Sequence, residues 1–118
     1  MNKRAVGSSY EDRAADYLRK NGVKVIARNF RSRFGEIDLV GYDGIYYIFI
    51  EVKYRSNKGV GNPAEAVDAR KQYRISRTAD FFRISRKLKD SDNVRFDVIS
   101  ILGDETVWYK AAFEYIEM

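Results

Sequence analysis

Four ionisable residues lie inside two very apolar segments of this sequence. Glu36 and Asp38 interrupt the segment 35–40, and Glu51 and Lys53 follow in the next apolar segment. Successive side chains of a strand point to opposite faces, so residues two apart share a face and each pair is expected to converge on one side of a sheet. Burying charges is costly unless they pair or bind a metal. The spacing therefore favours a metal-dependent phosphodiesterase site.

The residue types that are absent limit which metal and which chemistry are available. The 118-residue chain contains no histidine and no cysteine. Disulfides, thiolate metal sites and catalysis by Ser-His-Asp or Cys-His groups are thereby excluded. Any metal must be held by oxygen, and carboxylate and carbonyl oxygens suit Mg²⁺ or Mn²⁺. We therefore expect one of these two ions as the cofactor.

Length and composition favour one small cytoplasmic domain. A chain of 118 residues with 45% apolar content can form one hydrophobic core. No run of ~18 apolar residues is present to span a bilayer. The first residues, MNKRAVG, lack the apolar region of a secretion signal. We therefore expect a single domain over residues 1–118, located in the cytoplasm and without a membrane partner.

The charge balance favours a polyanionic partner. The formal net charge is +5 and the sequence pI is near 9.5, values typical of proteins that bind nucleic acid. A basic surface can also serve solubility alone. The positions of the basic residues have to decide between these two interpretations.

Hydrophobic periodicity and turn residues predict the order of helices and strands. A capping box, Ser8 to Glu11, opens a helix over about residues 9–21. Three strands in a meander follow, and the Asp43-Gly44 turn joins the second to the third. A long helix and two strands complete the chain. The expected strands span residues 23–27, with 29–35 as a basic loop or a continuation, then 36–40, 45–54, 93–102 and 106–110, and the long helix spans roughly residues 64–88.

Basic residues gather on the long helix and beside the expected strands. Arg70, Arg74 and Arg77 recur at helical spacing and form one stripe. The stripe is either a solvated helix face or a rail for phosphates. Segment 54–63, which holds glycines and the one proline, predicts a loop before the helix. The other expected nucleic-acid contacts are Arg28, Arg31, Arg33, Arg55 and Lys58.

This order of elements predicts an α/β sandwich with a mixed sheet, in which the long helix makes a right-handed crossover between two parallel strands. Four motifs then carry a resemblance: GEIDLV at 35–40, IEVKYR at 50–55, the stretch 64–72, and RFDV at 95–98. In this order they resemble the bacterial YraN-like family of the PD-(D/E)xK nuclease superfamily, which has the restriction-endonuclease-like fold. The resemblance covers nearly the whole chain and extends to Holliday-junction-resolvase-like nucleases. The proline of the superfamily motif is replaced by Ile37.

The resemblance implies a role for each matching residue. Asp38 and Glu51 match the two motif carboxylates and would hold the metal, with the Val52 carbonyl completing the site. Lys53 matches the motif lysine and would orient or help deprotonate the attacking water, or stabilise the pentacovalent phosphate. Glu11 is either a further metal ligand or only the last residue of the capping box.

Three further residues are expected near this site. Glu36 is either an outer ligand or a partner of Arg33 or Lys53. Lys71 and Gln72 match positions where superfamily relatives place polar side chains near the scissile phosphate. At helical spacing, one of these last two is expected to lie on the surface.

Asp97 is another carboxylate inside an apolar strand. It could reach the site from a neighbouring position. A hydrogen bond to Arg95 or to a turn amide is the favoured role.

The implied activity is hydrolysis of a nucleic-acid phosphodiester by a water that Mg²⁺ or Mn²⁺ activates. Backbone contacts from arginines do not read sequence, so DNA with branches, flaps or ends is the expected substrate. Cutting both strands of a junction would need a symmetric homodimer. The alternative is a non-catalytic DNA-binding or assembly module with a nuclease fold, acting in repair, recombination or DNA uptake.

Overall fold

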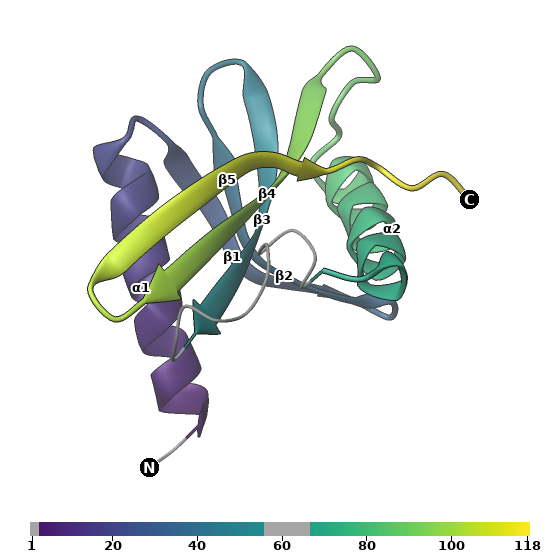
Figure 1. Cartoon of the computed structure of the whole chain (residues 1–118). Coiled ribbons are helices and arrows are strands. Elements are labelled where there is room, and N and C mark those ends of the chain that lie inside the picture. The colour runs from purple at the N-terminus through teal and green to yellow at the C-terminus, as the bar shows by residue number, and fades with distance from the viewer. Residues whose placement is uncertain (1–2, 56–66) are drawn as a thin grey trace.

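The structure of the protein, a computed structural model, describes residues 3–55 and 67–118 (Figure 1). No helix within these ranges is long and apolar enough to cross a membrane. The elements in chain order are α1 (Lys3–Lys20), β1 (Lys24–Ser32), β2 (Gly35–Tyr42), β3 (Tyr46–Arg55), α2 (Ala69–Ser85), β4 (Asn93–Leu102) and β5 (Glu105–Phe113).

The strands form one five-stranded mixed sheet in the order β1-β2-β3-β4-β5. β1 with β2, β2 with β3, and β4 with β5 pair antiparallel, whereas β3 and β4 pair parallel. Parallel neighbours require a crossover connection, and α2 lies in it. This arrangement confirms the predicted mixed sheet with an N-terminal helix, a three-strand meander, a crossover helix and C-terminal strands.

The two helices lie on opposite faces of the sheet, which therefore has a core on each side (Figure 1). Ala14 and Leu18 of α1 pack on one face with apolar side chains of β2, β3 and β4. Ile75 and Phe82 of α2 pack on the other face with a second set from the same strands. Because β2 and β3 contribute to both cores, their residues are held firmly from two sides.

Several element boundaries differ from those predicted. α1 begins at Lys3, so Ser8 lies inside the helix and the predicted capping box at Ser8 and Glu11 is wrong. β1 continues to Ser32 and β5 reaches Phe113. α2 has Asp68 as its N-cap and ends at Ser85, while the first residues of the predicted helix, 64–66, lie outside the described ranges.

A buried carboxylate fastens β5 to β4. Asp97 is fully buried and accepts hydrogen bonds from the Arg95 guanidinium at 2.9 Å, from Trp108 Nε1 at 2.8 Å and from the Ala111 N–H at 2.8 Å. The pairing register of β4 and β5 shifts at this position, and Ala111 has a φ of 52°. The predicted hydrogen bond between Asp97 and Arg95 is confirmed, and the role of Asp97 is structural.

We expect Asp97→Ala to lower the free energy of unfolding by about 3 kcal/mol, because it leaves the partly buried Arg95 and the Trp108 N–H without their acceptor. Urea unfolding followed by circular dichroism measures this change. Asp104→Ala, in the exposed turn between the same strands, is the control and should change stability by less than about 0.5 kcal/mol. Equal effects of the two substitutions would contradict the structural role of Asp97.

Candidate active site

The candidate site begins where β2 and β3 stop pairing. Their register runs from Tyr42 opposite Tyr47 to Leu39 opposite Ile50. Beyond that point the Val52 N–H donates a hydrogen bond of 2.8 Å to Asp38 Oδ2. The Asp38 carboxylate thus takes the place of a β2 backbone carbonyl as the acceptor. It satisfies a backbone donor that would otherwise be unpaired.

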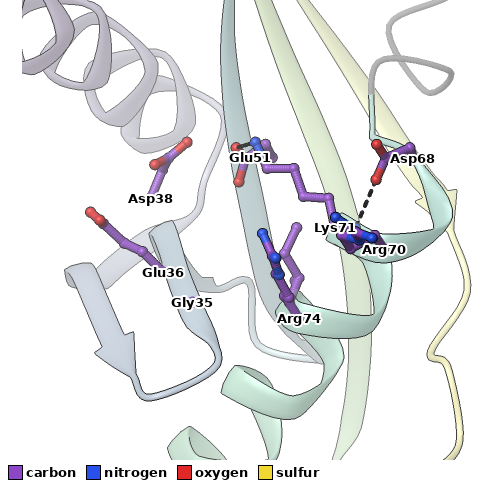
Figure 2. Close-up of a pocket in the computed structure, with 9 residues that line it drawn as sticks. Gly35, Glu36, Asp38, Glu51, Asp68, Arg70, Lys71 and Arg74 are labelled. Carbon is purple, nitrogen blue, oxygen red and sulfur yellow. Dashed lines mark hydrogen bonds and ion pairs between the residues drawn. The ribbon is translucent and has the colours of Figure 1, made fainter.

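The separation of the two strands leaves a pocket with a volume of about 590 Å³ (Figure 2). Residues of β2 form one wall, Glu51 of β3 lies at the back, and the first turns of α2 form the opposite wall. The predicted residues that line it are Glu36, Asp38, Glu51, Arg70, Lys71 and Arg74, and Gly35, Asp68 and Ile75 complete the lining. Residues predicted from distant parts of the sequence therefore meet in one pocket.

Glu51 is held by two ammonium groups. Its side chain is only 8% exposed, and its Oε1 lies 2.5 Å from Lys71 Nζ and 3.9 Å from Lys53 Nζ. Figure 2 shows the Lys71 side chain extending from α2 across the pocket to Glu51. The closer of the two cations therefore comes from the crossover helix rather than from the strand that carries Glu51.

Asp38 lies in an environment that disfavours its negative charge. Burial raises its pKa to about 7, and the negative charge of Glu51 acts in the same direction. The hydrogen bond from Val52 opposes this change without cancelling it. Near neutral pH, Asp38 is therefore divided between the protonated and ionised forms, and a nearby cation would stabilise the ionised form.

The two lysines beside Glu51 have pKa values that shift in opposite directions. Burial and the neighbouring Lys71 ammonium lower the pKa of Lys53. Burial opposes the charge of Lys71 as well, but the Glu51 carboxylate outweighs it and raises the Lys71 pKa. Lys71 is thus the firmly charged partner of Glu51, and Lys53 gives up its proton more readily than an ordinary lysine.

One amide group links two further carboxylates at the edge of the site. Asn29 Nδ2 donates to Glu11 Oε1 at 3.0 Å and to Glu36 Oε1 at 2.8 Å. Glu36 also pairs with Arg31 at 3.3 Å, so its predicted pairing with Arg33 or Lys53 is wrong.

Sequence reasoning missed Asn29. Its φ of 51° lies in the left-handed region, which asparagine adopts more readily than most residues. An asparagine within a predicted strand was the one available signal.

The metal-ligand predictions rest on oxygen donors that suit a hard cation. Asp38 and Glu51 are two close carboxylates whose mutual repulsion a divalent ion would relieve. Within residues 3–55 and 67–118, however, no group of three carboxylates is already arranged to hold a metal. Glu51 is ion-paired with Lys71. Glu36 is ion-paired with Arg31 and accepts a hydrogen bond from Asn29. The oxygen donors therefore fit Mg²⁺ or Mn²⁺, provided that the ion pair between Lys71 and Glu51 breaks when the metal binds. The Val52 carbonyl stays a predicted ligand.

The predicted auxiliary and basic residues divide between the pocket and its surroundings. Gln72 does not line the pocket, because its Nε2 donates to the Val67 carbonyl at 2.8 Å. Arg28 pairs with Asp12 at 2.7 Å, and Arg33 lies over the Phe34 ring. Arg55 ends β3. Lys58 falls outside the described residues.

The predicted stripe of three arginines is wrong at Arg77. This side chain is 3% exposed, because the C-terminal segment covers it. Its guanidinium donates to the Ile116 carbonyl, pairs with Asp80 at 3.2 Å, and lies 5.2 Å from the centroids of both the Tyr73 and Tyr115 rings. The exposed part of the stripe is therefore limited to Arg70 and Arg74.

We expect Asp38→Asn to stabilise the protein at pH 8 but not at pH 4, measured in chelator. The folded-state pKa of Asp38, about 7, lies above its ordinary value of 3.8. The unfolded chain therefore loses this proton first as the pH rises, and wild-type stability falls between about pH 4 and pH 7. The variant avoids that loss while retaining an acceptor for Val52, so its unfolding free energy should exceed that of wild type by about 2 kcal/mol at pH 8.

Denaturant unfolding at both pH values provides the measurement. Asp16→Asn is the control, because that side chain is 67% exposed in α1. The burial of the Asp38 charge would be refuted if Asp38→Asn and Asp16→Asn showed the same difference from wild type at pH 8 as at pH 4.

Comparison with known proteins identifies the family. Residues 10–101 match the family described as "Uncharacterised protein family UPF0102". A UPF0102 protein of Lachnoclostridium phytofermentans is 43% identical over 114 residues, which cover 97% of each chain. One of Fusobacterium nucleatum is 43% identical over 110 residues, covering 93% of this chain and 92% of that protein. One of Vibrio cholerae is 40% identical over 115 residues, covering 95% and 94%. The resemblance to the YraN-like family is thereby confirmed, and the chain belongs to UPF0102.

Proposed function

We propose that the protein is a metal-dependent nuclease that hydrolyses nucleic-acid phosphodiesters, with DNA as the favoured substrate. One observation carries the proposal. Asp38 and Glu51 meet where β2 and β3 separate, Lys53 lies beside Glu51, and the wall opposite β2 is basic. A structural role alone gives no reason to place two carboxylates of this kind in one pocket, since their burial is unfavourable.

Asp38 and Glu51 are the residues that would hold the cation. Mg²⁺ or Mn²⁺ bound there would neutralise charge on the phosphate and activate a water for attack. The cation would also remove the repulsion that now raises the Asp38 pKa. Asp38 would then remain ionised at neutral pH.

Lys53 is the candidate for proton transfer. Its Nζ lies 3.9 Å from Glu51 Oε1, and burial and the Lys71 charge lower its pKa. A lysine with a lowered pKa is better able to accept a proton from the attacking water at neutral pH. In its charged form, the same group would stabilise the negative charge that develops on the phosphate during in-line displacement of the 3′ oxygen.

Arg70 and Arg74 would position the nucleic acid. Both side chains are exposed and line the pocket on the wall opposite Asp38 (Figure 2). Contacts of arginine with phosphates fix a strand in place without reading its bases. The arrangement favours recognition of a DNA structure, such as a branch, flap or end, over a base sequence. A homodimer would place two such sites on one branched substrate.

A second candidate, a nuclease-fold module that binds or assembles on DNA without cutting it, is favoured by one observation. Lys71 already pairs with Glu51 at 2.5 Å, so this carboxylate has a positive partner without a bound cation. For this candidate, Asp38→Asn would leave DNA affinity unchanged or raise it, because the substitution removes a negative charge near the pocket.

The nuclease proposal is tested with linear, supercoiled, single-stranded and four-way-junction DNA in Mg²⁺, Mn²⁺ or chelator. We expect cutting only with metal, and at least a roughly hundredfold lower rate for Lys53→Ala, because proton transfer contributes a factor of this order. Lys20→Ala, an exposed lysine at the end of α1, is the matched control and should cut at the wild-type rate. DNA binding without cutting by any of the three proteins would instead support the binding module.

Arg70→Gln and Arg74→Gln should each weaken DNA binding. Each should also reduce the slope of log affinity against log salt concentration by about 1, because one phosphate contact is lost. Fluorescence anisotropy with a labelled junction over a salt series measures both quantities. Arg19→Gln, on the exposed part of α1, serves as the control and should leave the slope unchanged. Slopes that respond equally to all three changes would rule out a specific phosphate path along α2.

A further inference from the structure

We propose that Lys71 is an internal counter-ion of Glu51 that a divalent cation must displace, and that nucleic acid assists the displacement by offering Lys71 a phosphate. This inference rests on the proposed function, because it assigns a regulatory step to the same site. It makes Lys71 a positioning residue that couples binding of the metal to binding of the nucleic acid.

The distance between Lys71 and Glu51 indicates that a metal ion would have to compete with Lys71 for this carboxylate. Lys71 Nζ lies 2.5 Å from Glu51 Oε1, whereas Lys53 Nζ lies 3.9 Å from the same oxygen. The Glu51 side chain is 8% exposed, so it needs a positive partner where it lies. Since an ammonium and a divalent ion compete for the same carboxylate, the pair lowers the affinity of the free protein for metal.

The Lys71 side chain is free enough to leave Glu51 for another anion. The Lys71 side chain is 36% exposed, although its backbone is fixed by the hydrogen bond of its N–H to the N-cap Asp68 at 2.8 Å. A lysine ammonium sits on a flexible four-carbon stem. The Lys71 ammonium can therefore break its ion pair with Glu51 and pair with another anion, while α2 stays in place.

The surroundings indicate which anion would receive it. Arg70 and Arg74 line the same pocket as Lys71 (Figure 2). A phosphate drawn to these two guanidinium groups would lie within the pocket that the Lys71 ammonium already reaches. Movement of Lys71 to that phosphate would free Glu51 for the cation, so each ligand should raise the affinity for the other by the same factor.

Titration with Mn²⁺ alone, followed by the electron paramagnetic resonance signal of the free ion, tests the first step. We expect Lys71→Met and Lys71→Gln to bind Mn²⁺ roughly tenfold more tightly than wild type. Arg74→Met removes one positive charge from the same pocket without touching Glu51 and is the matched control, with less than roughly threefold change. The midpoint of thermal unfolding should also rise more on adding Mn²⁺ in the Lys71 variants than in wild type.

Repetition with a four-way-junction DNA in a Lys53→Ala background, in which we expect cutting to be at least roughly hundredfold slower, tests the coupling. DNA should tighten Mn²⁺ binding when Lys71 is present and have little effect when it is methionine. If wild type binds Mn²⁺ and the Lys71 variants bind it no more tightly than Arg74→Met, the counter-ion role is overturned while the proposed nuclease function stands. If no variant binds Mn²⁺, both are overturned.

Discussion

The hydrogen bond from the Val52 N–H to the Asp38 carboxylate is the interaction on which the rest of the site depends. It occurs where pairing between β2 and β3 ends, so these two strands can separate without leaving this donor unpaired. The separation opens the pocket. Glu51 faces α2 because it lies two residues after Phe49, which packs in the core under that helix. Because the cores on both sides of the sheet hold β2 and β3, their packing resists movement of the two carboxylates away from each other.

The repulsion between Asp38 and Glu51 explains why positively charged side chains lie around the pocket. Two neighbouring carboxylates, both largely removed from water, would be unfavourable in a domain of this size, and the raised Asp38 pKa records the cost. Lys71 reduces the cost by approaching Glu51 from the opposite wall, and Lys53 contributes from the strand itself. Binding of a cation would replace this internal compensation with a stronger one. The pocket therefore suits a ligand pair, a divalent ion and a phosphate, better than either ligand alone.

The arrangement of the strands followed from local signals, and for that reason it could be predicted. Alternating apolar residues defined the strands, the Asp43-Gly44 turn defined the hairpin, and a long helix between two strands implied a parallel crossover. Element ends were predicted less well. The helix predicted to start at a capping box begins at Lys3, because Lys3, Arg4 and Ala5 also have high helix propensity. Short capping patterns identify a possible start without excluding an earlier one.

Strand periodicity and one hairpin were enough to predict that Asp38, Glu51 and Lys53 lie near one another. Their partners could not be predicted in the same way, because these come from other parts of the chain. Lys71 reaches Glu51 because α2 packs across the sheet, and Arg77 of the same stripe is covered by the C-terminal segment. Helical spacing predicts that the arginines share one face of α2, but it does not predict which of them another segment of the chain will bury. Such contacts join residues far apart in the chain, and they depend on how helices and segments pack rather than on local pattern.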